Sequence, residues 1–459
     1  MCVGRSAKRR AATEESQRTA QGSRYTGASA LTGPNEPSHP RTLGRPVAPP
    51  HPRTLTPVVP VVGAEAAHVL AGTPEFRRIN LAVFAAGYSI FLLMYAVQPL
   101  LPIFTQEFHV TAATSSLALS LTTACLAVSM LVVGAIGEGW ARKPIMTASL
   151  FSAALLTLLS SVAQEWPTFL LIRTIEGIAI AGLPALAMAY LGEEIHPEAI
   201  GVSMGIYVGS GALGGMTGRL LTGVLTDHLS WRPALAIVGA LGMGASMVFA
   251  WYLPASVRFE PRSVSIASLL QTYKRHMRDR VFIALVSEAG LVLGTLVTVY
   301  NYIGFRLLAP PYSLSQTVVG SVFALYVFGF FSSSIIGMLS HRFGRPRLLA
   351  SSLVTMLTGV VATLARPLPV IIIGVALVTI GFFGAHSVSS SWVGLRAREG
   401  KAQASALYLF FYYTGASTAG SIGGIFWTVA GWTGVVGFLV VLLTVAIGIA
   451  ATRLTSEAG

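Results

Sequence analysis

Long apolar runs, separated by short polar breaks, fill the chain from Arg77 onward. A helix needs about 20 apolar residues to cross the hydrocarbon core of a bilayer. Because lipid offers the backbone no hydrogen-bond partner, such a run must be helical where it crosses. We therefore expect an all-α membrane protein with twelve transmembrane helices. The expected spans are 79–104, 113–136, 144–164, 167–190, 199–225, 233–253, 281–306, 317–339, 347–365, 368–392, 402–427 and 431–452.

The chain has few charged residues for its length of 459 residues. It is 53% hydrophobic and 11% charged, whereas a soluble domain carries about 25% charged residues. This deficit suits a surface that faces lipid. The net charge of +13 is compatible with nucleic-acid binding, but the basic residues lie in the breaks between apolar runs. That placement indicates membrane topology, so we expect no nucleic-acid partner.

The residues that would carry enzymatic or metal chemistry are not grouped. The two cysteines, Cys2 and Cys125, cannot form a disulfide framework, and no Cys/His cluster has metal-ligand spacing. The sequence contains no phosphate-binding loop of the Gly-x-x-x-x-Gly-Lys type. No nucleophile and base stand at a spacing that defines a catalytic site. We expect no metal, no cofactor, no enzymatic activity and no ATP-driven pumping.

The loop charges predict an orientation. If the N-terminus lies in the cytoplasm, most loop Lys and Arg residues fall on the cytoplasmic side, while Arg232 and Arg366 lie outside and Arg306 at a border. Positively charged loops stay in the cytoplasm. Both termini are therefore expected inside.

The chain divides into five parts. Residues 1–75 are rich in Pro, Arg, Ser and Thr and lack long apolar runs, so we expect a disordered tail. This tail is either a basic arm near anionic lipid or an inert extension. The longest internal break, 255–280, is basic and separates six runs from six. It predicts a cytoplasmic linker between bundles at 76–254 and 281–454, with a short tail at 455–459.

A repeated loop supports two related halves. The break after the second run and the break after the eighth share glycines and basic residues at matched places. Similar loops at equivalent positions indicate an internal repeat of six helices. The residues concerned are Gly134, Glu138, Arg142 and Lys143 in the first copy, and Gly337, Arg342, Gly344 and Arg345 in the second.

Both loops resemble the Gly-x-Leu-x-Asp-Arg-x-Gly-Arg-Lys signature of the major facilitator superfamily. The segments 190–197, 301–306, 381–392 and 423–427 resemble the arabinose-efflux-like branch of the superfamily, and two further motifs are similar to those of its twelve-helix drug:proton antiporters. One ends the first run with Gln98, Pro99 and Pro102, and the other places Arg173, Glu176 and Gly177 in the fourth. The resemblance implies two pseudo-symmetric six-helix bundles, loops that latch the bundles in one state, and a monomer in the bacterial cytoplasmic (inner) membrane.

Ionisable groups inside the spans are candidates for proton coupling, because a charge in the bilayer is costly unless it is paired or hydrated. Glu288 and His386 lie at matched depths in helices that line the central cavity of the resembled fold, so we expect them to face each other across it. His386 has an equally plausible role in packing. Arg173 and Glu176 share one helix face. They form either a coupling cluster with Arg219 or a static salt bridge.

Polar and aromatic side chains near the centre of the spans are candidates for a substrate cavity, although each suits a packing role as well. These candidates are Gln98, Tyr95, Tyr300, Asn301 and Arg219.

The sequence and the resemblance together predict a secondary transporter with alternating access, which couples proton entry to efflux of a small organic compound such as a drug or sugar. The alternatives are an uncoupled facilitator or importer of a metabolite, and a non-transporting membrane sensor with a transporter fold.

Overall fold

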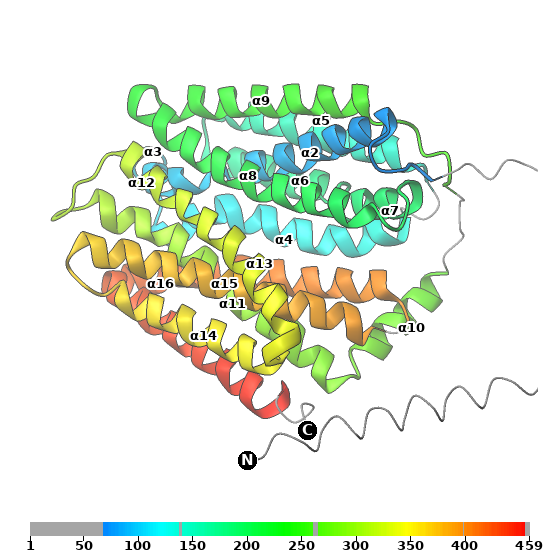
Figure 1. The fold of residues 1–459 in the computed structure, drawn as a ribbon. Helices are drawn as coiled ribbons and strands as arrows, with labels where there is room; N and C mark the ends of the chain where they lie inside the picture. The colour runs from blue at the N-terminus through cyan, green and yellow to red at the C-terminus, as the bar shows by residue number, and fades with distance from the viewer. Residues whose placement is uncertain (1–67, 137–139, 260–264, 398, 455–459) are drawn as a thin grey trace, which may run out of the picture. The chain divides into compact units, whose positions relative to one another are not determined.

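The computed structural model describes residues 68–136, 140–259, 265–397 and 399–454, which all belong to one compact unit, Ala64–Gly459. Helices joined by loops make up the described part of the chain, and its one β feature is an isolated bridge (Figure 1). The first half contains α2 (Pro74–Tyr95), η1 (Gln98–Leu100), α3 (Leu101–Glu107), α4 (Ala112–Ile136), α5 (Arg142–Ser160), α6 (Trp166–Ile180), α7 (Pro184–Glu194), α8 (Ile200–His228) and α9 (Trp231–Tyr252).

The second half follows a short helix, α10 (Ile266–His276). It contains α11 (Arg280–Leu308), α12 (Gln316–Ser321), η3 (Val322–Leu325), α13 (Tyr326–Phe343), α14 (Arg345–Ala362), α15 (Leu368–Arg396), α16 (Lys401–Ile449) and η4 (Ala450–Leu454).

Each of the twelve predicted spans falls on helix within the described residues, so the predicted all-α fold is confirmed. Three spans are interrupted: the first, the fourth and the eighth, which runs through α12, η3 and α13. Proline accounts for the first two interruptions, because it removes a backbone donor. Pro99 and Pro102 divide the first span into α2, η1 and α3, and Pro184 starts α7 after a break in the fourth. The last two spans form the single element α16, which is kinked at Ala430 and Gly431.

Eight of these helices are long and apolar enough to cross a membrane by length and composition alone. The difference from twelve has local causes. α16 holds two spans in one element, and the fourth span is divided between α6 and α7. Glycine and serine lower the mean hydropathy of α8, and two arginines lower that of α14.

The packing pairs repeat from one half to the other. α2 packs on α8 and α9, and α4 and α5 pack on α6; in the second half α11 packs on α16, and α13 and α14 pack on α15. Between the halves, α4 packs on α16, and α8 packs on α12. The second helix of each half thus meets the fifth helix of the other half, as a pseudo-twofold relation requires.

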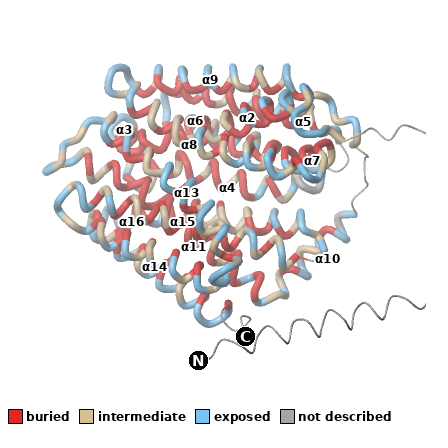
Figure 2. The backbone as a smooth tube through the Cα atoms, viewed as in Figure 1, coloured by how far each residue is buried: buried red, intermediate tan, exposed pale blue. Residues whose placement is uncertain are grey.

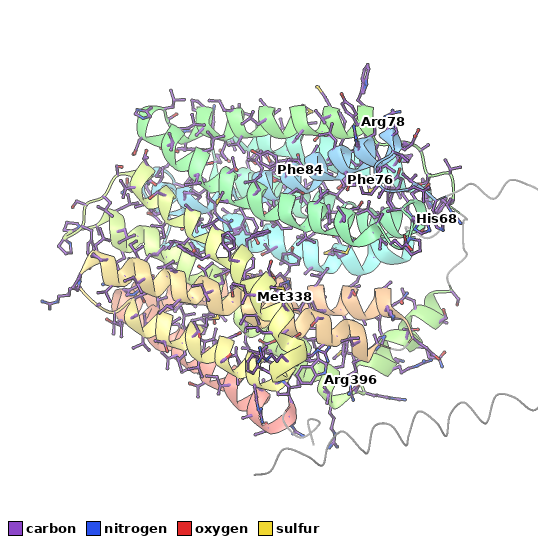
Figure 3. All side chains as sticks on the ribbon, in the orientation of Figure 1. His68, Phe76, Arg78, Phe84, Met338 and Arg396 are labelled. Atoms are coloured by element: carbon purple, nitrogen blue, oxygen red, sulfur yellow. The ribbon has the colours of Figure 1, made fainter. Side chains whose placement is uncertain are left out.

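The outward faces of the helices are exposed, whereas the inward faces are buried (Figure 2). Many of the exposed residues are large and apolar. Phe84 and Met338, both labelled in Figure 3, are two of them, with exposed fractions of 37% and 68%. A soluble monomer rarely exposes apolar surface on this scale. Hydrocarbon removes the cost of exposing these side chains, which is consistent with a bundle embedded in lipid.

The first helix begins earlier than the sequence predicts. α2 starts at Pro74, and the hydroxyl of Thr73 caps it by accepting the Phe76 N–H. Before it, Val69 pairs with the segment after α7, donating to Glu194 and accepting from His196. Residues 68–75, assigned to the disordered tail by sequence, thus carry defined structure. The rest of that tail, residues 1–67, and residues 455–459 lie outside the described residues.

The halves approach closely at one end of the bundle. Asp227, near the end of α8, accepts hydrogen bonds from the Gln316 and Thr317 N–H groups of α12, at 2.9 and 2.7 Å. Nearby, a Cβ on Gly223 would lie 3.0 Å from the Cα of Gly320. This is the closed end. At the other, basic end, α5, α11, α14 and α16 begin with Arg142, Arg280, Arg345 and Lys401.

Candidate functional site

A buried polar cluster joins the two halves between the closed end and the middle of the bundle. Arg219 Nε donates to Gln98 Oε1 at 2.6 Å, and Gln98 Nε2 donates to Asn301 Oδ1 at 2.7 Å. Each of these side chains is 1% exposed. Arg219 and Gln98 come from the first half and Asn301 from the second, so the cluster spans the contact between halves.

Aromatic rings surround the Arg219 guanidinium. Its central carbon lies 3.8 Å from the ring centre of Tyr95, 4.8 Å from that of Tyr326 and 5.1 Å from that of Phe323. The electron-rich ring faces attract a cation. No carboxylate within the described residues forms an ion pair with Arg219.

Tyr300 completes the cluster from α11. Its hydroxyl hydrogen-bonds with that of Thr379 on α15 at 2.8 Å, and its ring centre lies 5.0 Å from those of Phe323 and Tyr326. The five residues predicted to line a substrate cavity, Gln98, Tyr95, Tyr300, Asn301 and Arg219, are thus neighbours. Sequence reasoning missed Phe323, Tyr326 and Thr379, because nothing in the sequence distinguishes them from the other residues of their apolar runs.

Arg173 and Glu176 form a separate, fully satisfied salt bridge. Arg173 Nη1 contacts Glu176 Oε2 at 2.5 Å, and both side chains are 0% exposed. Arg173 also donates to the carbonyls of Ala118 and Met94, while Glu176 accepts from Thr157. The pair therefore ties α6 to α2, α4 and α5. This geometry matches the static salt bridge, and the expected grouping of the pair with Arg219 is not observed.

Glu288 and His386 lie in the same half. Ser389 Oγ of α15 donates to Glu288 Oε2 at 2.6 Å, and the Tyr408 hydroxyl hydrogen-bonds with His386 Nδ1 at 2.8 Å. Tyr408 also interacts electrostatically with Glu288, which links the two groups. α11 and α15 pack against each other. The two groups therefore approach one another inside one bundle and do not face each other across the contact between halves.

The first predicted latch loop forms hydrogen bonds with neighbouring helices of its own half. Arg142 donates to the Glu193 carboxylate at 2.8 and 3.4 Å, and Lys143 donates to the carbonyl of Leu253 at 2.5 Å. These bonds tie the start of α5 to the ends of α7 and α9. Gly134 belongs to the last turn of α4, and Glu138 lies outside the described residues.

The second predicted latch loop is a tight turn between α13 and α14. Gly344 has a φ of 83°, a left-handed conformation that suits glycine, and Arg345 begins α14. Arg342 lies over the ring of Phe343, 5.5 Å from its centre. Gly337 lies close to α15, where a Cβ would be 3.2 Å from Ser387 Oγ.

An ion pair that the sequence did not predict joins the end of α15 to the start of α11 in the second half. Arg396, at the end of α15, donates to Asp279 Oδ2 at 2.5 Å, while Asp279 Oδ1 caps α11 by accepting from Val281 and Phe282. Partial burial raises the pKa of Asp279, but the Arg396 and backbone hydrogen bonds outweigh it, so this pKa lies below its usual value.

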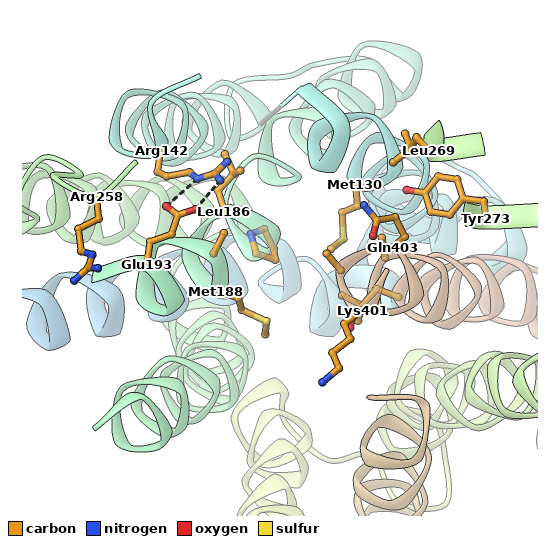
Figure 4. A pocket seen from close by; sticks show the side chains of 16 residues that line it. Met130, Arg142, Leu186, Met188, Glu193, Arg258, Leu269, Tyr273, Lys401 and Gln403 are labelled. Carbon is orange, nitrogen blue, oxygen red and sulfur yellow. Dashed lines mark hydrogen bonds and ion pairs between the residues drawn. The ribbon is translucent and has the colours of Figure 1, made fainter. Parts of the chain in front are cut away.

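A cavity of about 570 Å³ opens between the halves at the basic end (Figure 4). Met130 of α4 and Leu409 of α16 line it from opposite halves, and Tyr273 of α10 closes one side. Its charged lining residues are Arg142, Arg258, Lys401 and Glu193. Within the described ranges, no group of three or more His, Cys, Asp or Glu residues could hold a metal ion.

A lipid-compatible bundle of two related halves, with a cavity at one end and a polar cluster between the halves, defines a multi-pass membrane transporter. The sequence profile of the Major Facilitator Superfamily matches residues 80–313. The chain is 47% identical over 380 residues to the uncharacterized MFS-type transporter YybF of Bacillus subtilis, covering 83% of this chain and 94% of that protein. The chain belongs to the Major Facilitator Superfamily.

A second relative matches over a similar length of the chain. The inner membrane transport protein YnfM of Escherichia coli is 43% identical over 383 residues, covering 83% of this chain and 92% of that protein. The family and these relatives are transporters, so the expectation that the chain is not an enzyme is also confirmed.

Solved structures share the fold at low identity. A bacterial homologue of the human lysosomal transporter Spinster, in an inward-facing and occupied conformation, has a TM-score of 0.68 at 15% identity and covers 84% of this chain and 97% of its own. The nucleoside transporter NupG has a TM-score of 0.64 at 15% identity, with coverage of 81% and 99%.

Proposed function

We propose that this chain is a secondary transporter that works by alternating access, and that the structure represents its inward-facing state. The cavity at the basic end carries this proposal. The two halves are closed at the opposite end through Asp227 and the Gln98–Asn301 bond, so the cavity has access from one side. Positive loops favour the cytoplasm, so we assign the opening and both termini to the cytoplasmic side of a bacterial inner membrane.

Glu288 is the group we assign to proton coupling. It is 1% exposed, Ser389 donates to one of its oxygens, and the other has no hydrogen-bond partner in the described part of the chain. No described cation pairs with it. An unpaired carboxylate in a bilayer costs several kcal/mol. The group therefore favours a bound proton when closed off and releases it when a conformational change admits water.

His386 lies close enough to share this role. Its Nδ1 is hydrogen-bonded to Tyr408, which also interacts with Glu288. No hydrogen bond joins the Tyr408 hydroxyl to Glu288 among the described residues, so its role here is to hold the His386 ring near the carboxyl group. Tyr408 thus extends the coupling site toward the start of α16, which borders the cavity through Leu409.

The direction we propose is efflux of a small organic compound as protons enter. A membrane potential of 100 mV supplies about 2.3 kcal/mol for each charge moved, which is enough to concentrate a substrate severalfold. An uncoupled facilitator or importer is the alternative, and it would move substrate without the Glu288 carboxyl group. We expect a monomer to suffice, because the cavity and the polar cluster lie within one chain.

Proton flux in liposomes tests the assignment. The purified chain is reconstituted with a trapped pH-sensitive dye, and ethidium, benzoate and arabinose are supplied in separate gradients as probes. We expect one probe to drive proton movement, and Glu288→Gln to abolish it while probe exchange continues. Glu107→Gln, which changes an exposed carboxylate paired with Arg232, is the control and should leave the flux unchanged. Normal flux in Glu288→Gln would refute the assignment.

A further inference from the structure

The cavity at the basic end has an apolar interior and a charged mouth (Figure 4). Arg142 and Lys401 are the first residues of α5 and α16, and Glu193 is next to the last residue of α7. Leu409 lies eight residues along α16 from Lys401, or about 12 Å. Most of the lining beyond the mouth is apolar, including Met130, Leu186, Met188, Ala406 and Leu409. The cavity is therefore amphipathic along its depth.

The mouth of the cavity is positively charged. Arg142, Arg258 and Lys401 line it together with a single carboxylate, Glu193. Arg142 already binds Glu193 at 2.8 Å, whereas Lys401 forms no ion pair with a carboxylate of the described residues. A surface of this sign concentrates anions and repels cations. An acidic group at the mouth is therefore favoured, and it can stay in contact with water there.

The interior of the cavity suits a flexible apolar chain. Met130 and Met188 line it from α4 and α7, and methionine side chains adapt to apolar groups of different shape. The volume of about 570 Å³ is that of a site for a drug-sized molecule. Each CH2 group that moves from water into such an interior strengthens binding about fourfold. A single apolar chain of moderate length therefore binds here better than a short one.

The walls of the cavity belong to both halves and to the linker. α4, α5 and α7 contribute from the first half and α16 from the second, while Tyr273 belongs to α10. α10 is attached to the second half by an ion pair between Arg275 and Glu399. In the alternating-access cycle proposed above, this end closes when the outer end opens. A ligand that fills the cavity keeps the walls apart, so it binds the inward-facing state selectively.

We propose that this cavity is an inhibitory site for a single-chain amphipathic anion, whose acidic head lies near Lys401 and whose apolar chain lies between Met130 and Leu409. A ligand held by the charges of the mouth has to leave before the mouth can close, so it stops the cycle. Binding stands on the cavity alone, whereas inhibition rests on the proposed transport function.

Protection of a cysteine in the cavity tests binding. Ser405→Cys lies in the lining on α16, and Ser268→Cys, at an exposed position of α10 outside the lining, is its control. Each is made in a chain whose native cysteines are replaced. A maleimide labels them in nanodiscs, where both sides of the protein are accessible.

Alkyl sulfonates are the probes because their charge does not change with pH. We expect decanesulfonate to slow the labelling of Ser405→Cys and to leave Ser268→Cys unchanged. The concentration for half protection should rise about fourfold for each CH2 group removed, through octanesulfonate to hexanesulfonate. Decyltrimethylammonium, a cation with the same chain, should give no protection at equal concentration.

Variants place the binding at the proposed residues. Lys401→Glu reverses the charge at the mouth and should weaken protection about tenfold or more. Ala406→Trp fills the interior without a change of charge and should abolish protection. Arg347→Glu, which reverses an exposed charge at the start of α14 outside the lining, is the control and should behave like the parent. Labelling rates with and without ligand are compared within each variant, since a substitution can alter the reactivity of the cysteine.

Inhibition has a separate readout. Val319→Cys lies in the closed outer contact, where Val319 is 2% exposed. Decanesulfonate should slow its labelling in nanodiscs, because the ligand holds the molecule inward-facing, and should stop the proton flux driven by a transported probe. Protection of Ser405→Cys without slower labelling of Val319→Cys would overturn the inhibitory role.

The remaining outcomes separate the site from the transport proposal. Protection that persists in both Lys401→Glu and Ala406→Trp, or equal protection by the cation, would overturn the site. If labelling of Ser405→Cys is slow until acidic phospholipid is omitted from the nanodiscs, a membrane lipid occupies the cavity and the proposed ligand is wrong. The expected protection without proton flux under any condition would support the site and contradict the proposed transport. Gel filtration shows whether each variant is folded, and Lys401→Glu, at an exposed position, carries the test if Ala406→Trp is not.

Discussion

Gln98 and Asn301 stand 203 positions apart in the sequence, and a single 2.7 Å hydrogen bond between their buried side chains joins the two halves of the molecule. The bond lies behind the closing contact of α8 with α12. If the halves separate at this end during transport, the bond has to break. In the alternating-access cycle that we propose, its strength would contribute to the balance between inward-open and outward-open states.

Gln98→Leu should shift that balance toward the outward-open state. The change leaves donors and acceptors on Arg219 and Asn301 unsatisfied in the closed arrangement, at a cost of about 1–3 kcal/mol. A shift of about 1 kcal/mol changes the population ratio about fivefold. The measurement is labelling of Val319→Cys, a position 2% exposed in the closed contact, by an impermeant maleimide in whole cells, with the native cysteines replaced.

The control for this experiment is Thr379→Val. It removes the bond to Tyr300, which joins α11 and α15 inside one half, so it should leave the labelling rate unchanged. Equal labelling in Gln98→Leu and the parent would show that the bond does not hold this end closed.

Arg173 and Glu176 should behave as a structural pair. Arg173→Gln leaves a buried carboxylate without its partner, which costs about 3–5 kcal/mol, whereas replacing both residues by Met should cost much less. Thermal unfolding of Arg173→Met, Glu176→Met and the double Met variant forms the required cycle, and Arg173→Gln is measured beside them. If Arg173→Gln unfolds like the parent but loses proton flux, the pair belongs to the coupling machinery instead.

The spans could be predicted from sequence because the signal is long and collective. Some twenty apolar residues in a row have few alternatives to crossing a bilayer. The start of the first helix could not be predicted in this way. It depends on a local hydrogen bond from the Phe76 N–H to Thr73 and on the backbone pairing of Val69 with the segment that follows α7. Arg77 and Arg78 interrupt the apolar pattern there, so the pattern alone gave a later start.

The partners of the buried charges depend on helix rotation, which the sequence does not specify. Depth along a helix follows from residue number, at 1.5 Å per residue, but each residue also turns the side chain by a fraction of a turn. Arg173 and Arg219 both border the end of the first helix, yet Arg173 reaches the Met94 carbonyl, and Arg219 reaches Tyr95 and Gln98. Depth alone therefore could not show which of these neighbours each arginine would reach.

Two glycines of α8 should respond in opposite ways to substitution by alanine. A Cβ on Gly214 would overlap the backbone carbonyl of Tyr88 on α2, whereas a Cβ on Gly209 would meet nothing within 4 Å. Gly209→Ala should be neutral or stabilising by up to about 1 kcal/mol, because alanine favours helix. Gly214→Ala should lower the unfolding temperature by several degrees or prevent expression. Equal behaviour of the two variants would contradict the close packing of α2 on α8.

The stability contributed by Asp279 should depend on pH. Because its pKa is lowered by Arg396 and by the backbone N–H groups of α11, the contribution is complete above the unfolded-state pKa of about 4 and is lost as pH falls through the folded-state value. Asp279→Asn keeps a helix cap and removes the ion pair. The unfolding temperatures of the variant and the parent should therefore differ at pH 7 and converge as the pH falls below about 4. Asp279→Ala removes the cap as well and should cost about 1 kcal/mol more at pH 7. A difference between parent and Asp279→Asn that grows on acidification would mean that the carboxyl group stabilises the fold in its protonated form.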